Sequence, residues 1–517
     1  MHTRKNRILL LISLLIVSLT LAGCQPASTP APAPEKPAEP QPTDAKLVLT
    51  VAQAADATHL DPNVQLERYS TNVVVNLFDP LLKRDENMVP KPHLATSVEA
   101  LDDLTWEVKL RENVTFHNGE PIDAQSVKFT VDRIFDPALK SVLPTWLRGI
   151  TEVKIIDSHT VHILTEMPMP LMLQNLTMIY PVPPKYVTEV GNEEFSLKPV
   201  GSGPYKLKEW QRDQKVILEA VDGHWLGRPA YDEVHFHFIP EEESRVSALL
   251  AGNVDIVFEI PPAGRRRVDA ASGLEVRAVE AGRVQLLQIS VTDGHPLLQD
   301  KRVRQAIAYA IDTEAIIEHV MFGAAFRIST ILNPKNFGFH PYLKAYEYDP
   351  AKARQLIKEA GFEGAEFVIN TNPATKSLAE ALAAQLRQVG LNASIATFER
   401  AAQLAGWRAH SLGGHAHLPG LLSQTWDADG LLYLRFAKDE PMAYYYEPKV
   451  DDLVKKGRTT MNEDERRAVY WELMEILHEE MPIIPLYGVM SLYGVKENIV
   501  WEPRSDEYMF LYEARPR

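Results

Sequence analysis

The chain of 517 residues has little cysteine and no excess of positive charge. Its single cysteine, Cys24, excludes an intrachain disulfide and a zinc site built from cysteines. The 54 lysines and arginines are outnumbered by 69 aspartates and glutamates, which gives a formal net charge of −15. Nucleic-acid binding needs a basic surface, so we expect no nucleic-acid partner.

Motifs of common catalytic sites are also missing from the sequence. It contains no His-Glu-x-x-His zinc motif, no Gly-x-Ser-x-Gly nucleophile turn and no Gly-x-x-x-x-Gly-Lys-[Ser/Thr] phosphate loop. We therefore predict a protein that is not an enzyme and that needs no cofactor. The apolar fraction of 45% and the charged fraction of 24% are ordinary for a globular protein of two or three domains.

The first 24 residues have the pattern of a targeting segment. Arg4, Lys5 and Arg7 precede an apolar run over residues 8–22, which is shorter than the roughly 20 residues that a membrane span needs. The run ends in Leu-Ala-Gly-Cys24, which resembles a bacterial lipobox. We therefore predict a signal peptide over residues 1–23, lipidation of Cys24, and a lipid anchor that holds the protein at the periplasmic face or outer surface of the cell membrane. The alternative is a plain secretory signal with an incidental cysteine.

Residues 24–45 contain seven prolines between Pro26 and Pro42. Such a segment favours extended polyproline II structure and cannot build a core, so we predict a tether. No later segment is apolar enough to cross a bilayer, and we expect residues 46–517 to form a soluble body.

Hydrophobic periodicity predicts mixed α and β structure in this body. Strands are expected at residues 47–53, 106–110 and 255–258, and hairpins at 154–164 and 205–220. Helices are expected at residues 124–134, 241–251, 301–310, 313–320, 350–359 and 376–388, and in a long segment that Asn462 caps and Pro482 ends. Because hairpins dominate before residue 284 and helices dominate after residue 301, we expect a domain boundary near residue 284.

Several short motifs, in order along the body, resemble the extracellular solute-binding proteins, family 5, of peptide and nickel ABC transporters. Taken singly they look structural: the Gly-Ser-Gly-Pro turn is expected to use positive φ, and an Asp-Pro pair to begin a helix. The motifs are Leu60-Asp61-Pro62, Leu104-Thr-Trp106, Phe116-His117-Asn-Gly119, Ala124-Gln-Ser-Val127, Gly201-Ser-Gly203-Pro204-Tyr205, Val303-Arg304-Gln-Ala306, Asp349-Pro350 and Pro482-Ile-Ile-Pro485.

The resemblance implies a large class II periplasmic-binding fold of the mixed α/β kind, in which two lobes close on a ligand. Lobe 1 would comprise residues 46–284 and 487–517, and lobe 2 residues 285–486, with crossing segments near 284–291 and 483–487. It also implies a monomer that captures a peptide-like solute and delivers it to ABC permease subunits and their ATPases. A nickel or metal-chelate receptor of the same fold is the alternative.

The resemblance also points to candidate ligand residues. Peptide binders of the family hold the ligand ammonium with an aspartate in a Trp-x-x-Asp pattern, which here places Asp429 as the anchor and Trp426 beside it. A desolvated ammonium needs such a counter-charge. In many relatives the pattern continues differently from the Gly430-Leu431-Leu432 found here. The alternative for Asp429 is that it only caps the following helix.

Three further side chains are candidates for the same cleft. Lys376 lies close to the place where dipeptide binders of the family carry an arginine for the ligand carboxylate. Tyr69 and Tyr445 could form aromatic walls, although ordinary core packing is the alternative for both.

Histidines supply the candidates for metal binding. His410, His415 and His417 lie within eight residues, and imidazole suits nickel or zinc. They would form the site of a metal or metal-chelate receptor. A zinc-dependent hydrolase built on His415 and His417 is a remote alternative.

Overall fold

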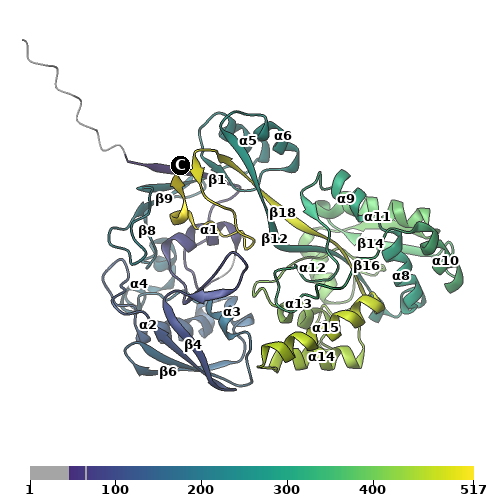
Figure 1. Ribbon diagram of the computed structural model, residues 1–517, viewed down its shortest axis with the longest axis horizontal. Coiled ribbons are helices and arrows are strands. Elements are labelled where there is room, and N and C mark those ends of the chain that lie inside the picture. Colours follow the sequence, from purple (N-terminus) through teal and green to yellow (C-terminus); the bar gives the residue numbers. More distant parts are fainter. Residues whose placement is uncertain (1–45, 65–66) are drawn as a thin grey trace, which may run out of the picture. The chain divides into compact units, whose positions relative to one another are not determined.

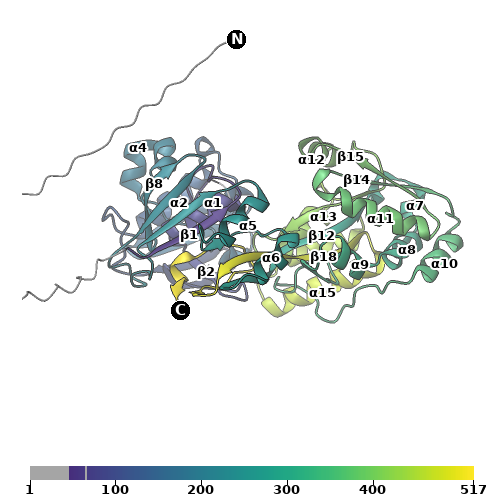
Figure 2. The ribbon, with the colours of Figure 1, turned by 90° about the horizontal axis from the view of Figure 1, so that it is seen from above.

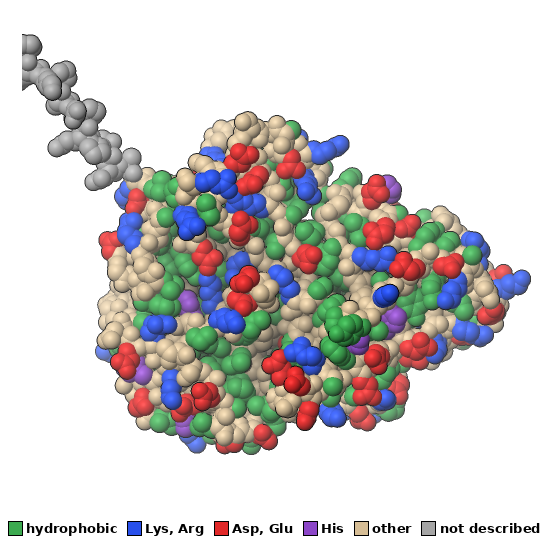
Figure 3. Space-filling view, in the orientation of Figure 1, with side chains coloured by type: hydrophobic (Ala, Val, Ile, Leu, Met, Phe, Trp, Pro, Cys, Tyr) green, Lys and Arg blue, Asp and Glu red, His purple; other side chains and the backbone are tan. Residues whose placement is uncertain are grey.

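The computed structural model describes residues 46–64 and 67–517. The predicted signal peptide, the lipidation site Cys24 and the proline-rich tether lie outside the described residues. In the described part, no helix combines the length and the apolar character needed to cross a membrane. Acidic and basic side chains are interspersed on the face shown in Figure 3.

A mixed sheet of twelve strands runs through the body and is shared by two lobes. Its main path is β15-β14-β16-β12-β18-β11-β1-β10-β9-β8, so the long strands β12 (Leu274–Ile289) and β18 (Ile483–Lys496) lie in the middle. These two strands pair antiparallel, and Figures 1 and 2 both show them side by side between the two sets of elements. These two strands are therefore the segments of the chain that connect the two lobes.

Lobe 1 is formed by the elements that precede β12 and by the chain after β18. Its strands in the large sheet are β1 (Val48–Gln53), β8 (Tyr205–Gln211), β9 (Lys215–Ala220), β10 (Glu233–Phe238) and β11 (Ile256–Val257). A separate four-stranded sheet contains β4 (Ala95–Asp102), β5 (Thr105–Leu110), β6 (Ile150–Asp157) and β7 (Thr160–Thr165). Short pairs are β2 (Leu82–Arg84) with β3 (Pro90–Pro92), and β19 (Ile499–Val500) with β20 (Arg515–Pro516). The helices are α1 (Arg68–Leu77), α2 (Ala124–Phe135), α3 (Met172–Leu176), α4 (Pro184–Leu197), α5 (Glu242–Leu250) and α6 (Arg265–Asp269).

Lobe 2 lies between β12 and β18 in the sequence and is mainly helical. Its strands are β13 (Ala325–Phe326), β14 (Glu366–Thr371), β15 (Asn392–Thr397), β16 (Ala416–His417) and β17 (Gly420–Leu422). Its helices are α7 (Pro296–Gln299), α8 (Lys301–Ala310), α9 (Thr313–His319), α10 (Pro350–Ala360), α11 (Lys376–Gln388), α12 (Arg400–Arg408), α13 (Ala428–Phe436), α14 (Pro448–Thr459) and α15 (Glu463–Glu480).

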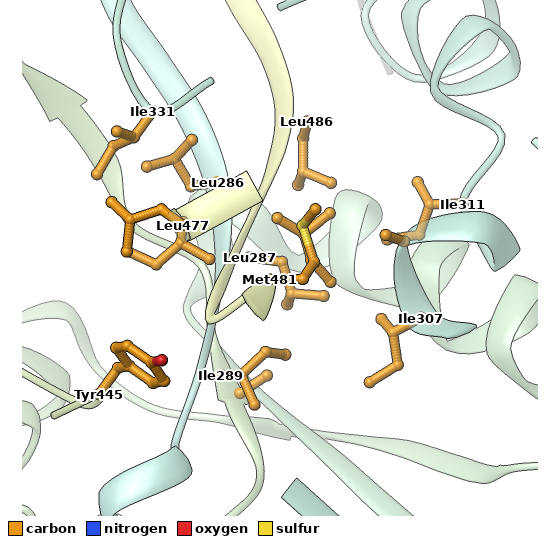
Figure 4. Packing of buried hydrophobic residues seen from close by; sticks show 14 of the residues in the cluster. Leu286, Leu287, Ile289, Ile307, Ile311, Ile331, Tyr445, Leu477, Met481 and Leu486 are labelled. Atoms are coloured by element: carbon orange, nitrogen blue, oxygen red, sulfur yellow. The ribbon is translucent and has the colours of Figure 1, made fainter. Parts of the chain in front are cut away.

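Each lobe has its own hydrophobic core. The buried members of the lobe 2 core lie between residues 284 and 487, and Figure 4 shows Leu286, Leu287 and Leu486 of the crossing strands among its packed side chains. In lobe 1, one cluster joins β1, β9 and β10 to the C-terminal residues Met509–Leu511, and another fills the four-stranded sheet and α2. Burial of these apolar surfaces, at about 25 cal/mol per Å², is the main source of each lobe's stability.

The expectation that the Gly-Ser-Gly-Pro turn uses positive φ is wrong for both of its glycines. Neither Gly201 nor Gly203 has a positive φ. Instead, the backbone of α1 passes so close that a Cβ on Gly201 would lie 1.9 Å from Leu77 O, and one on Gly203 would lie 2.7 Å from Asn76 O. Glycine is required here for close packing of two backbones and not for an unusual turn.

The pairing of β12 with β18 is interrupted where the chain passes from one lobe to the other. The register shifts between Glu280 and Val284, and Gly282 lies in the interruption. A bulge of this kind bends a strand and re-aims its ends. The bend lies next to the boundary expected near residue 284.

Candidate functional site

A small cavity of about 60 Å³ lies between the two lobes. Lobe 1 contributes the segment before β6 and the segment that leads into α3, and lobe 2 contributes α13 and the end of α14. A cavity of this volume holds a few water molecules. The lining residues are Thr145, Trp146, Arg148, Met167, Pro168, Met169, Leu171 and Asn175 of lobe 1, and Thr425, Asp429, Gly430, Tyr433, Leu434 and Arg458 of lobe 2.

Asp429 reaches this cavity from the first turn of α13. The N-cap of α13 is Asp427, whose side chain accepts a hydrogen bond from the Asp429 backbone N–H. Asp427 is fixed in turn by Arg466 of α15, which donates two hydrogen bonds of 2.7 Å to its two carboxylate oxygens. The alternative that Asp429 caps the helix is therefore wrong, because Asp427 fills that position and leaves the Asp429 carboxyl free for the cavity.

The Asp429 carboxyl is buried without full compensation of its charge. Only 7% of the residue is exposed, and among the described residues its Oδ1 atom has no hydrogen-bond partner. Its Oδ2 atom lies 4.0 Å from Nη2 of Arg458, which is too long for a hydrogen bond. Burial raises the pKa of the Asp429 carboxyl to about 6, although the Arg458 guanidinium opposes this shift. A bound cation would supply the missing partner.

Other polar atoms around the cavity are also without partners. In the described part of the chain, no group bonds to Oγ1 of Thr425, Oδ1 of Asn175 or Nη1 of Arg458, although all three atoms are buried. A buried polar atom without a partner costs roughly 1–3 kcal/mol. Thr425 and Arg458 belong to lobe 2 and Asn175 to lobe 1, so one polar ligand can bond to both lobes.

The rest of the wall suits an organic solute. Aromatic rings come from Trp146 and Tyr433, and thioethers from Met167 and Met169. Ligand sites commonly combine such apolar walls with a few polar groups that set orientation. Gly430 adds room, because a Cβ there would lie 3.3 Å from Thr425 Oγ1 and 3.6 Å from the Trp146 ring.

A larger groove of about 460 Å³ lies elsewhere between β2, β3 and the segment after β19. Its basic side chains already have partners. For example, Lys83 contacts Glu513, Arg504 pairs with Asp506, and Lys335 donates to the Glu86 carbonyl and the Ser505 hydroxyl. The smaller cavity at Asp429 is therefore the better candidate, because it holds the buried atoms without partners.

The structure places two of the predicted site residues outside this cavity. Trp426 is 2% exposed, and its ring lies against Gly282 of the crossing strand β12. Lys376 begins α11, where its side chain is 54% exposed and lies 3.8 Å from Glu380.

The two predicted tyrosines also lie away from the cavity. Tyr445 is buried in the core of lobe 2. Tyr69 is half-buried in lobe 1, packs edge-on against Phe258 and donates a hydrogen bond of 3.2 Å to Glu259. Both positions are the ordinary packing that was the alternative for these residues.

The three candidate histidines do not form a metal site. Tyr444 lies beside both His410, at 4.0 Å between ring centroids, and His417, at 4.9 Å. His415 accepts a hydrogen bond of 2.8 Å from the Val368 backbone N–H. Across residues 46–64 and 67–517, no three histidine, cysteine or acidic side chains are grouped so as to hold a metal ion. The cluster therefore does not supply the three ligands that a metal site built from these histidines would need.

Sequence reasoning missed most of the cavity lining. Arg458 stands 29 positions after Asp429 and on a different helix, and Asn175 and Trp146 come from the other lobe. No local pattern marks these residues. Trp146 is partly exposed and Arg148 is exposed in the structure, which the sequence does not reveal.

The match to a protein family and the match to an individual protein each cover most of this chain. The family described as "Bacterial extracellular solute-binding proteins, family 5 Middle" matches residues 89–442. The glutathione-binding protein GsiB of Escherichia coli O1:K1 is 28% identical over 458 residues, which cover 85% of this chain and 88% of that protein.

Solved structures share the fold. HbpA2 from Haemophilus parasuis has a TM-score of 0.84 at 21% identity, with 91% of this chain and 100% of that chain covered. The periplasmic binding protein DppA from Helicobacter pylori, in complex with the peptide STSA, has a TM-score of 0.75 at 23% identity, with 91% and 98% covered. These two likenesses establish the large periplasmic-binding fold with two lobes.

Proposed function

Because the chain belongs to the family 5 bacterial extracellular solute-binding proteins, we propose that it captures a peptide-like solute between its lobes, with Asp429 as the anchor for the ligand ammonium. Proteins of this family are binding proteins of transport systems that act outside the cytoplasm, so the chain is a binding protein and not an enzyme.

One observation carries this proposal. Oδ1 of Asp429 is buried in a cavity between the lobes and has no hydrogen-bond partner among the described residues. An ammonium group is a strong donor to a carboxylate, and such charge-assisted bonds are worth about twice a neutral one. A ligand with a free ammonium is thus the partner that this atom lacks.

Two relatives support a peptide-like solute by what they bind. GsiB is a glutathione-binding protein, and the DppA structure contains the peptide STSA. The solute would pass to the membrane permease subunits of an ABC importer, whose separate ATPases supply the energy.

The same proposal covers the organisation of the chain. Residues 1–23 act as a signal peptide, Cys24 carries the lipid anchor, residues 24–45 form the tether, and the protein works as a monomer. Lobe 1 comprises residues 46–284 and 487–517, and lobe 2 comprises residues 285–486. The core of lobe 2, whose buried members lie between residues 284 and 487, supports a division near these positions.

The test is a thermal-unfolding experiment on the purified protein with peptides of two to five residues and with N-acetylated copies of the same peptides. A ligand at 100 times its Kd stabilises the folded state by about 2.7 kcal/mol. We expect the free-amine peptides to raise the melting temperature and the acetylated copies to leave it unchanged.

The variant Asp429→Asn should lose the stabilisation by free-amine peptides. Asp103→Asn is the matched control, because Asp103 is exposed at the turn between β4 and β5. Equal stabilisation by free and acetylated peptides would contradict the anchor role of Asp429.

A further inference from the structure

Arg466, near the start of α15, bonds to both helices that carry the polar wall of the cavity. Its two Nη atoms donate to the two carboxylate oxygens of Asp427, the N-cap of α13, and its Nε atom donates to the Gly457 carbonyl of α14, each at 2.7 Å. Asp427 stands two residues before Asp429, and Gly457 stands directly before Arg458. One guanidinium, in a residue that is only 3% exposed, therefore connects the backbone next to both charged side chains of lobe 2 that line the cavity.

Close packing strengthens this junction. α14 packs against both α13 and α15 (Figure 1). A Cβ on Gly457 would lie 2.5 Å from the Tyr470 ring of α15, so glycine is required where α14 approaches this ring. The Tyr470 hydroxyl also accepts a hydrogen bond of 3.0 Å from Arg466. The end of α14 is therefore held against α15 at the place where Arg466 bonds to it, with little freedom to shift.

The ion pair between Asp429 and Arg458 is open in this arrangement. Nη2 of Arg458 lies 4.0 Å from Oδ2 of Asp429, beyond hydrogen-bond reach, and Oδ1 of Asp429 has no partner among the described residues. A movement of about 1 Å would bring the two groups to the usual distance of a charge-assisted bond. The guanidinium of Arg458 rests on the ring of Tyr433 in α13, 3.9 Å from the ring centre, so the relative position of α13 and α14 determines whether the pair is open or closed.

Resting on the proposed function, we propose that Arg466 is a positioning residue of the binding site. It holds α13 and α14 in the arrangement that keeps Asp429 and Arg458 apart, so that the Asp429 carboxylate stays available to the ammonium of a ligand. Arg466 itself is not among the described residues that line the cavity. Its contribution is preorganisation, because the ligand does not have to break an existing ion pair in order to bind.

Removing Arg466 alone would not test this role, because it leaves the buried Asp427 carboxylate without its partner. The double variant Asp427→Asn with Arg466→Met removes both charges together, and asparagine is still a good N-cap for α13. It also removes two opposing effects on the pKa of Asp429, since Asp427 raises this pKa and Arg466 lowers it. Two charged groups that act on Asp429, Arg458 of α14 and Arg148 of lobe 1, remain.

The measurement is the affinity for a free-amine peptide as a function of pH, by isothermal titration calorimetry on the purified protein. The probe is a peptide of two to five residues that stabilises the protein in the thermal-unfolding experiment, and the range of about pH 4.5 to pH 7 keeps its ammonium protonated. Asp429 must be ionised to bind an ammonium. In the original protein the affinity should therefore fall as the pH drops below about 6, the pKa to which burial raises Asp429.

In the double variant we expect Arg458 to close on Asp429 in most molecules. If the pair is open in roughly a tenth of them, the peptide affinity near pH 7 falls about tenfold. The closed pair favours the ionised carboxyl by the same factor, so the acid fall in affinity moves down by about one pH unit. Arg466→Lys keeps a charge opposite Asp427 but lacks the planar set of donors that also reaches Gly457, so it should change both quantities by a smaller amount.

A second buried ion pair of the same kind provides the matched control. Arg133 and Asp61 bond in lobe 1, with 5% and 0% of their side chains exposed, and neither is among the described residues that line the cavity. Asp61→Asn with Arg133→Met should leave the peptide affinity and its pH dependence unchanged. An equal change in this control would overturn the positioning role of Arg466, because loss of any buried pair would then have the same effect.

The outcomes separate this inference from the proposed function. If the affinity falls at the same pH in the double variant and in the original protein, the role of Arg466 is overturned, even where the variant binds more weakly, and Asp429 remains the anchor. If the double variant binds too weakly to titrate, the same comparison on Arg466→Lys decides. Failure of every free-amine peptide to bind the original protein would overturn the proposed function and this inference together.

Discussion

Burial and the incomplete ion pair with Arg458 shift the pKa of the Asp429 carboxyl in opposite directions. Burial is the larger effect, and it raises the pKa to about 6 from an ordinary value of 3.8. The folded protein therefore holds this proton more tightly than the unfolded chain does. The resulting contribution to stability is present in full below about pH 4 and is lost as the pH rises through 6.

The raised pKa of Asp429 gives a prediction for the stability of the protein without added peptide. Asp429→Asn removes the buried charge, so we expect it to increase the free energy of unfolding at pH 8 by on the order of 1–3 kcal/mol. At pH 4, where the carboxyl is already protonated in the folded state, the variant and the original protein should unfold alike. Urea denaturation at the two pH values measures the difference, with Asp103→Asn as control. A difference of equal size at both pH values would contradict the raised pKa.

Sequence patterns could single out Asp429, which lines the cavity, as a candidate, but could not predict its surroundings. The Trp-x-x-Asp pattern is local, and the capping role of Asp427 follows from the helix that begins there. Arg458 could not be found in this way, because its proximity to Asp429 depends on how α14 packs against α13. Trp426 illustrates the opposite error: an aromatic residue beside an anchor is expected in the wall, yet its ring fills space next to Gly282.

At the scale of elements, local signals predicted helices well and the sheet poorly. The helices expected at residues 301–310 and 376–388 agree with α8 and α11, since capping and amphipathic periodicity are encoded within each segment. The order β14-β16-β12 joins strands from distant parts of the sequence and has no local signature. Likewise, the tight contact of Gly201 with α1 is a property of two elements together.

The bend in β12 gives a prediction at this scale. A Cβ on Gly282 would lie 2.7 Å from two carbon atoms of the Trp426 ring, so Gly282→Ala must displace that ring or the strand. We expect a loss of about 1–3 kcal/mol in the free energy of unfolding, the usual cost of overpacking. Urea denaturation measures it, and adding Trp426→Phe to the same chain should recover part of the loss.

Gly420→Ala is the control for this substitution. Gly420 lies on β17, which pairs with β12. A Cβ there would meet its nearest neighbour, Gln285 Oε1, at an ordinary contact distance of 3.4 Å. An equal loss of stability in both variants would show that the Trp426 contact is not the cause.

At the scale of the whole body, two lobes with separate cores share one sheet through β12 and β18. Polar contacts between the lobes also lie outside these strands. Arg84 of lobe 1 donates to the Gln424 carbonyl of lobe 2, and Lys335 of lobe 2 donates to the Glu86 carbonyl and the Ser505 hydroxyl of lobe 1. Contacts of this kind are each worth about 0.5–1.5 kcal/mol, which is compatible with the lobe closure that the proposed function requires.

Lys335 therefore offers a test of lobe closure that leaves the cavity lining unchanged. Lys335→Met removes hydrogen bonds of 2.9 Å and 2.8 Å to lobe 1, so it should shift the population of the protein toward separated lobes. We expect a larger radius of gyration by small-angle X-ray scattering without added peptide, and peptide affinity weakened by about twofold to fivefold, because part of the binding energy must then restore closure. Saturating peptide should return the radius of gyration to that of the original protein.

Lys344→Met, at an exposed position of lobe 2, should change neither quantity. If Lys335→Met also leaves both unchanged, these contacts do not hold the lobes together, and closure depends on the bend in β12 and on the ligand alone.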